Sequence, residues 1–212
     1  MYGVDVSENL SGSGTESESG TSSGSSSCPS TGCLFVTVGN VVGAEGLILT
    51  SPDGITWTSR NSGSTNFIGD VSYGNGIFVT SGGMYEITFD YITSSDGISW
   101  SKNSMNINYY ISGITFGNGL FLVMGDSGLI MSSTDGLSWT TRTSGTSKDL
   151  SSGTYGNGRY VVVGDDGTIL TSPDGITWTS RTSGTTNSLF GVTFQNGIFI
   201  SLGPYGTILT ST

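Results

Sequence analysis

One short element recurs along the chain and limits the folds open to it. The element is Asp-Gly-x-x-Trp, and its successive tryptophans are 43, 39 and 39 residues apart. A fixed period of this length indicates an array of similar structural units, and it takes precedence over a domain count based on the length of 212 residues. The element occurs at Asp53–Trp57, Asp96–Trp100, Asp135–Trp139 and Asp174–Trp178.

Each unit holds signals for four short strands. In the clearest unit, Ser152–Tyr155 is followed by Asn157-Gly158, a dipeptide typical of tight hairpins because both residues accept positive φ. The next three segments are rich in β-branched residues and are separated by turns that contain glycine; they are Arg159–Val163, Thr168–Ser172 and Ile176–Arg181. Three hairpins in series predict an antiparallel meander, and four strands in a period of about 40 residues are typical of a β-propeller blade.

The sequence therefore predicts an all-β protein, a five-bladed β-propeller of four-stranded antiparallel blades whose last blade is incomplete. The second-strand signal occurs five times, from Leu34–Val38 to Ile198–Leu202. Gly206–Thr212 repeats the third strand with no fourth-strand signal after it, so we expect an exposed edge that can pair with another chain. The alternative is an arc of a larger ring that another chain completes.

Three segments are expected along the chain. Residues 1–7 are predicted to form a strand at the inner edge of the first blade, residues 8–33 a Ser/Gly-rich loop or linker, and residues 34–212 the propeller repeats. From Ser11 to Ser27 the chain contains only Ser, Gly, Thr and Glu, which cannot bury enough apolar surface to offset the entropy of ordering. We expect this arm to dock on a larger body.

The composition argues against several classes of partner and cofactor. The net charge is −10, with 6 basic against 16 acidic residues, which disfavours binding to nucleic acid or to anionic membranes. Neither a membrane-spanning apolar run nor a signal peptide is evident. Cys28 and Cys33 favour a small disulfide loop, with free thiols as the alternative; the absence of histidine argues against a metal site. No cofactor is expected.

The pattern Ser-x-Asp-Gly-x-x-Trp resembles the Asp-box, also called the bacterial neuraminidase repeat, of sialidase-type propellers. It is one residue shorter than the usual form, and it looks like the compact version common in uncharacterised bacterial and phage repeat proteins. The resemblance implies structural turns rather than a function. We expect the aspartates to accept hydrogen bonds from the turn backbone and the tryptophans to pack between blades; these residues are Asp53, Trp57, Asp96, Trp100, Asp135, Trp139, Asp174 and Trp178.

The same resemblance places the turns between second and third strands, and the connections between blades, on one face that usually carries ligands. These segments differ from unit to unit while the strands stay alike, which is consistent with recognition or with simple loop drift. Asparagine, aspartate and tyrosine side chains also suit sugar hydroxyls. The candidate ligand-binding residues are Asn66, Phe67, Tyr109, Tyr110, Asp149, Asn187, Asp126 and Asp165.

The sequence argues against catalysis. Arg60, Arg142 and Arg181 each follow a tryptophan by three residues, so they occupy one repeat position and are expected to be spread around the ring. A sialidase instead gathers three arginines on the substrate carboxylate. No histidine is available as a general base, no acidic pair suited to glycoside hydrolysis is evident, and the acidic turns do not match a calcium loop.

We therefore expect a non-catalytic structural or adhesive module of an extracellular assembly, above all a phage virion protein of the tail, fibre or capsid decoration. Protein partners, homo-oligomers or docking through the N-terminal arm are expected. The alternative is a lectin-like, glycan-binding propeller of a secreted or cell-surface protein. A third hypothesis is an intracellular or lumenal assembly factor, since some Asp-box-like propellers scaffold photosynthetic complexes.

Overall fold

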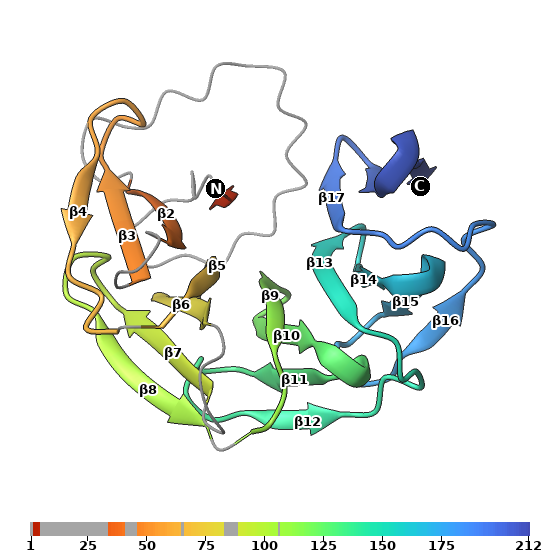
Figure 1. Ribbon diagram of the computed structural model, residues 1–212, viewed down its shortest axis with the longest axis horizontal. Helices are drawn as coiled ribbons and strands as arrows, with labels where there is room; N and C mark the ends of the chain where they lie inside the picture. The colour runs from red at the N-terminus through yellow and green to blue at the C-terminus, as the bar shows by residue number, and fades with distance from the viewer. Residues whose placement is uncertain (1, 5–33, 41–45, 65, 83–88, 106) are drawn as a thin grey trace.

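The structure is a computed structural model that describes residues 2–4, 34–40, 46–64, 66–82, 89–105 and 107–212. These residues form five antiparallel sheets arranged side by side in an arc (Figure 1). Within each sheet the strands follow chain order, and β5, β9, β13 and β17 lie nearest the centre of the arc (Figure 1). The expected all-β architecture of four-stranded antiparallel meanders is confirmed.

The sheets are numbered here in chain order. The first contains β1 (Tyr2–Val4), β2 (Phe35–Asn40), β3 (Gly46–Ser51) and β4 (Thr58–Arg60). The second contains β5 (Ile68–Gly74), β6 (Ile77–Gly82), β7 (Phe89–Ser94) and β8 (Ser101–Met105). The third contains β9 (Ile111–Gly117), β10 (Leu120–Gly125), β11 (Ile130–Ser133) and β12 (Thr140–Arg142). The fourth contains β13 (Leu150–Gly156), β14 (Arg159–Gly164), β15 (Ile169–Ser172) and β16 (Thr179–Arg181). The fifth contains β17 (Gly191–Gln195), β18 (Ile198–Leu202) and β19 (Ile208–Ser211).

The two ends of the arc differ from the middle. The N-terminal strand β1 pairs antiparallel with β2, so the start of the chain supplies the inner strand of the first sheet. The fifth sheet has three strands in the described part of the chain, and β19 is its outer edge. The rest of the N-terminal segment, including Cys28 and Cys33, lies outside the described residues.

Local sequence explains the turns between the first and second strands of a sheet. Asn157 and Gly158 have φ of 47° and 72°, the left-handed values that a two-residue hairpin requires. The glycine that ends an inner strand has a different role: a Cβ on Gly117 would lie 2.2 Å from Tyr155 of the next sheet. Its missing side chain therefore lets neighbouring sheets approach closely.

The core consists of apolar clusters between consecutive sheets. Between the third and fourth sheets, for example, Leu122, Met124 and Ile130 pack against Tyr160 and Leu170. Similar clusters lie at the other three junctions. The second strands β10 and β14 place side chains in the clusters on both faces of their sheets, so these strands are buried on both sides. This burial accounts for their nearly continuous apolar sequence.

Three short 3-10 turns connect second to third strands: η1 (Asp126–Gly128), η2 (Asp165–Gly167) and η3 (Pro204–Gly206). In each turn a residue other than glycine adopts a left-handed conformation, with φ between 53° and 56°. Among the described residues, no helix is long and apolar enough to cross a membrane.

Candidate functional site

The aspartates of the Asp-Gly-x-x-Trp elements are used within their own turns. Asp53 Oδ1 accepts hydrogen bonds from the backbone N–H of Ile55 (2.8 Å) and Thr56 (2.7 Å), and from the Ser51 hydroxyl (2.8 Å). The same three bonds form at the other elements, whose aspartates are Asp96, Asp135 and Asp174.

These hydrogen bonds stabilise the charged carboxylates. The backbone and serine donors lower the pKa of Asp53, Asp96 and Asp174 to about 2 and lower that of Asp135 as well. All four carboxylates therefore fix their own turns through Oδ1.

The four tryptophans fall into two groups. Trp100, Trp139 and Trp178 are half-buried against the clusters between their own sheet and the preceding one. Trp57, in the first sheet, is 41% exposed. The expected position between sheets thus holds for three of the rings, whereas Trp57 lies at the end of the arc.

The connections between sheets lie beside the 3-10 turns, on one face of the molecule. The sequence predicted this arrangement for the candidate ligand face. The backbone N–H of Asp126 in η1 donates to Tyr110 O (3.0 Å), in the connection before the third sheet. Asp165 N in η2 likewise donates to Asp149 O (2.9 Å), before the fourth sheet. We call the surface formed by these connections and turns the loop face.

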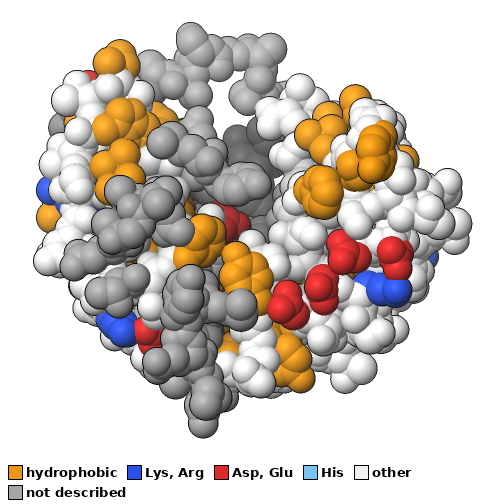
Figure 2. Space-filling view, viewed as in Figure 1, with side chains coloured by type: hydrophobic (Ala, Val, Ile, Leu, Met, Phe, Trp, Pro, Cys, Tyr) orange, Lys and Arg blue, Asp and Glu red, His pale blue; other side chains and the backbone are white. Residues whose placement is uncertain are grey.

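An acidic patch occupies the part of the loop face above the third and fourth sheets (Figure 2). Burial, and then the charges of Asp149 and Asp165, raise the pKa of Asp126. Asp149 Oδ1 accepts a hydrogen bond from Ser127 N (2.7 Å) in η1. In the described part of the chain, no group of three or more His, Cys, Asp or Glu side chains is arranged to hold a metal.

One lysine accompanies this acidic patch. Lys148 Nζ lies 2.5 Å from Asp166 Oδ2, and both side chains are exposed. This pair neutralises only one carboxylate of the four that η1, η2 and the adjacent connection contribute, so the patch keeps a negative potential.

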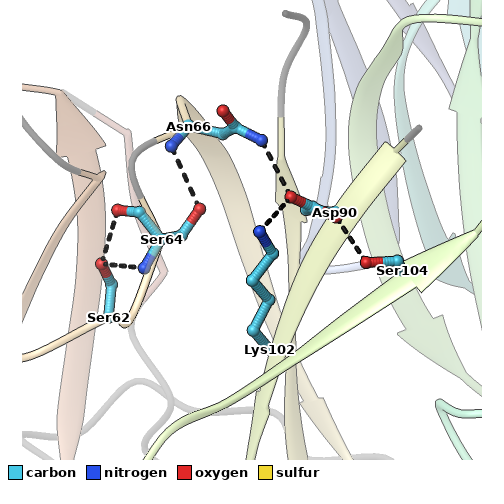
Figure 3. A network of polar contacts seen from close by, with 6 residues as sticks. All are labelled: Ser62, Ser64, Asn66, Asp90, Lys102 and Ser104. Atoms are coloured by element: carbon cyan, nitrogen blue, oxygen red, sulfur yellow. Dashed lines mark hydrogen bonds and ion pairs between the residues drawn. The ribbon is translucent and has the colours of Figure 1, made fainter. Parts of the chain in front are cut away.

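The two candidate asparagines are structural. Asn66 Nδ2 donates to Asp90 Oδ2 (3.0 Å), which also pairs with Lys102 Nζ (2.6 Å), as Figure 3 shows. Burial by itself would raise the pKa of Asp90, but the hydrogen bonds of Lys102, Ser104 and Asn66 and the Lys102 charge outweigh it and leave the pKa lowered. Asn187 Nδ2 donates to Thr207 Oγ1 (2.8 Å) in the same way, from connection to turn.

The candidate aromatic residues lie around an open central cavity of about 900 Å³. Phe67 and Tyr110 line this cavity, and Tyr109 beside them is 48% exposed. The sequence interpretation missed Phe190, which also lines the cavity and is 60% exposed. Phe190 directly precedes β17, and its repeat position holds Gly69, Ser112 and Ser151 in the other sheets, so no pattern along the strand singled it out.

The cavity wall is formed by the inner strands β5, β9, β13 and β17. One hydroxyl from each strand, at the same repeat position, lines it: Ser72, Thr115, Thr154 and Thr193. Asp70 adds a carboxylate that the sequence interpretation did not single out. Burial raises the pKa of Asp70 to about 6, against the hydrogen bonds that it accepts from Ile114 N (3.1 Å) and Val71 N (2.8 Å).

The arginines do not form a substrate-binding cluster. Arg60, Arg142 and Arg181 lie on β4, β12 and β16, the outer strands of three different sheets. Each donates from Nε to a hydroxyl of the adjacent strand, at 2.7–2.8 Å. They therefore brace the outer edges of the sheets.

No protein-family model matches the sequence, and no curated protein does. The structure is similar to YCF48 bound to a D1 peptide, with a TM-score of 0.63 and 19% identity over 84% of this chain and 60% of that chain. It is also similar to YCF48 from Cyanidioschyzon merolae (TM-score 0.62, 16% identity, 84% and 65% coverage). A Trypanosoma rangeli sialidase aligns with a TM-score of 0.57 and 12% identity over 79% of this chain and 41% of the enzyme.

The chain thus spans less than two thirds of the length of each of these three structures. At identities below 20% the likeness concerns architecture alone. Together with the five meander sheets around a central cavity, it establishes that this chain has a β-propeller fold.

Proposed function

We propose that this chain is a non-catalytic binding module that takes up an extended segment of a protein partner at the loop-face mouth of its central cavity. The observation that carries the proposal is the combination, on one face, of a cavity of about 900 Å³, exposed aromatic rings and an acidic patch. A similar propeller, YCF48, is bound to a D1 peptide, which supports a peptide as the kind of ligand.

The chemistry of the face selects the partner segment. Aromatic side chains such as Tyr109 and Phe190 supply contact area for apolar anchors at low entropic cost. The acidic patch of Asp126, Asp149 and Asp165 favours a segment that carries arginine or lysine beside those anchors. The expected ligand is therefore a basic, extended peptide with at least one large apolar residue.

The setting that we propose is a larger assembly, with this chain as a structural or adhesive component. A surface of serine, threonine, asparagine and glycine with 10% charged residues suits an extracellular particle, such as a phage tail, fibre or capsid decoration. In this proposal the compact Asp-box element is a scaffold for five blades and takes no direct part in binding.

Binding of the basic segment is tested with the full-length chain and an array of fluorescent peptides of varied charge. We expect basic peptides to bind with micromolar Kd, and the double variant Asp126→Asn/Asp165→Asn to weaken binding at least tenfold. Thr179→Ala, on the outer strand β16, is the control and should bind as the parent does. Peptide binding that ignores both the charge of the peptide and the double variant would refute the proposal.

Glycan binding is the second candidate, favoured by Tyr205, which is 96% exposed in η3. Tyrosines at such positions can stack on a pyranose ring and donate a hydrogen bond. A glycan array decides between the two: binding that is lost in Tyr109→Ala or Tyr205→Ala, without peptide binding, would replace the protein partner with a carbohydrate.

A further inference from the structure

Asp70 is the one acidic residue among the described residues that line the central cavity. It is the third residue of β5, so it lies roughly 7 Å inward from the loop-face end of this strand. Phe67 and Tyr110 line the same cavity at its mouth. A ligand that enters past these two rings therefore meets a carboxylate below them.

Backbone hydrogen bonds fix the orientation of this carboxylate. Val71 N donates to Asp70 Oδ1 (2.8 Å), and Ile114 N, from the neighbouring inner strand β9, donates to Oδ2 (3.1 Å). A carboxylate has about four acceptor positions, so both oxygens keep capacity for a further donor. Asp70 is thus held from two sheets and can still bind a ligand.

A glycine leaves space beside Asp70. Gly113 stands in the third sheet at the repeat position of Asp70, and a Cβ on it would lie 3.7 Å from Asp70 Oδ2. The same Cβ would lie 3.2 Å from the carbonyl oxygen of Ser151, a residue that lines the cavity from the fourth sheet. Two oxygens from different sheets therefore approach one small space, which suits a group with several donors.

No lysine or arginine side chain of this chain neutralises Asp70. The sequence has 6 lysines and arginines and no histidine. All six lie in the described part of the chain, and none lines the cavity. The two lysines pair with Asp90 and Asp166, and three of the arginines brace outer strands. The fourth, Arg159, begins β14 at the hairpin end, away from the loop face.

The surroundings of Asp70 make its charge costly without a cation. Burial raises the pKa of Asp70 to about 6, although the hydrogen bonds from Ile114 N and Val71 N lower it. The other inner strands and β2 contain no charged residue, and the phenol of Tyr110 is the only other titratable side chain in the described cavity lining. A cation beside Asp70 would therefore compensate a carboxylate that is mostly ionised at neutral pH.

We infer that the central cavity binds a primary ammonium group, with Asp70 as its counter-ion. This inference deepens the proposed function and rests on it: the basic residue of the partner segment is a lysine, whose side chain enters the cavity while the segment lies at the mouth. The four-carbon stem packs along Phe67 and Tyr110, and the ammonium donates to Asp70 Oδ2.

Lysine fits this site better than arginine does. Arginine binds a carboxylate best through two parallel hydrogen bonds, and at Asp70 each oxygen already accepts a backbone N–H. The ammonium of lysine is a compact charge with three rotatable donors, which suits single acceptors that lie in different directions. The cavity thus selects lysine, whereas the acidic patch at the mouth attracts both residues.

The experiment measures the pKa of Asp70 in the full-length chain by NMR of its carboxyl carbon, with n-butylammonium as a minimal lysine side chain. We expect millimolar binding, as for other ligands of a few atoms, and a lower pKa of Asp70 at saturation. Affinity should rise about tenfold from pH 5 to pH 7.5, which is the ratio of the ionised fractions for a pKa of about 6. Neutral n-butanol should leave the pKa unchanged. Asp70→Asn should abolish binding, and Thr179→Ala on the outer strand β16 should bind as the parent does.

Peptides connect this site to the proposed function. In a lysine peptide that binds, acetylation of the lysine Nζ should weaken binding at least tenfold in the parent but threefold or less in Asp70→Asn, which is the coupling expected of a direct contact. Replacement of the lysine by arginine should weaken binding severalfold. The two proposals fail separately, because Asp126→Asn/Asp165→Asn should weaken peptide binding and leave the binding of butylammonium unchanged.

Two results would overturn the inference. In the first, butylammonium at tens of millimolar leaves the pKa of Asp70 unchanged, or butanol changes it equally. In the second, the pKa of Asp70 without ligand lies at the ordinary value of 3.8 or below, which would show that the carboxylate already has a cationic partner.

Discussion

The junction of the third and fourth sheets and that of the fourth and fifth sheets are built from nearly the same residue types. At the first, Tyr160 and Leu170 are fully buried, and the Asp-Gly turn and Trp178 close the outer edge. At the second, Phe199 remains in the apolar cluster, but Leu209 is only half-buried and borders a cavity of about 370 Å³. Burial at these junctions therefore depends on the Asp-Gly-x-x-Trp segment of the following sheet as well as on the apolar residues themselves.

The largest expected effect is a loss of stability that differs between the two junctions. Tyr160→Ala removes a ring from the closed junction and should lower the free energy of unfolding by about 3–5 kcal/mol. Phe199→Ala should cost less, because part of its surroundings is already open. Urea denaturation measures both changes, and equal losses would contradict the difference between the junctions.

The tryptophans provide a matched pair for the same contrast. Trp178→Ala opens the closed outer edge and should destabilise the protein by about 2–3 kcal/mol, below the full cost of a buried aromatic because the ring is half-buried. Trp57→Ala, at the end of the arc, should cost about 1 kcal/mol or less, as for other surface changes. Similar shifts in the urea midpoint would show that Trp57 is covered in solution.

At the inner strands the junctions differ less, because a hydrogen bond crosses both the second and the fourth junction there. The pH dependence of stability tests the contribution of Asp70 to this inner edge. Asp70 Oδ2 accepts from Ile114 N across the second junction, and Ser152 Oγ accepts from Val192 N (3.3 Å) across the fourth. Because the pKa of Asp70 is about 6 in the folded state against an ordinary value of 3.8, the folded state binds more protons between pH 4 and 6. The stabilising contribution is present below pH 4 and is lost as the pH rises through 6.

Asp70→Asn removes this titration and keeps an oxygen acceptor for Ile114 N. Relative to the parent, the variant should gain about 1–2 kcal/mol on going from pH 4 to pH 8, less than the full shift implies because part of the side chain faces the open cavity. Unfolding curves at both pH values measure the gain. If the free energy of unfolding of parent and variant changed with pH in parallel, the charged form of Asp70 would not destabilise the folded state.

The smallest expected effect comes from partly filling the open junction. Val161→Leu places at the fourth junction the residue that stands at the equivalent position of the third, Leu122. It should raise stability by about 0.5–1 kcal/mol, or a few degrees in Tm, as for other cavity-filling changes. Leu122→Val is the reverse control, and it should destabilise the closed junction.

Several features of the fold could be predicted from the sequence because their causes are local. The Asn-Gly hairpins follow from residues that tolerate left-handed φ, and the Asp-Gly turns from carboxylates that accept hydrogen bonds two and three residues ahead. The four-stranded sheets followed from the order of these turns along a period near 40 residues.

Less of the candidate site could be predicted from the sequence. The loop segments that it singled out do share one face, but Asn66 and Asn187 prove to be structural ties to Asp90 and Thr207. Asp70 was missed because its repeat position holds glycine or serine in other sheets, and only the assembled inner strands place it in a cavity. The predictions for the N-terminal arm concern residues 5–33, which the structure does not describe.

The sequence by itself determined the repeat, its turns and its strand order, because those depend on hydrogen bonds and backbone preferences within a few residues. The tertiary structure decided which copies of a residue are buried. Ile130 is fully buried, whereas Ile208, its equivalent in the fifth sheet, is 64% exposed. The two residues have the same local sequence pattern, and their burial differs because it depends on contacts from a neighbouring unit about 40 residues away.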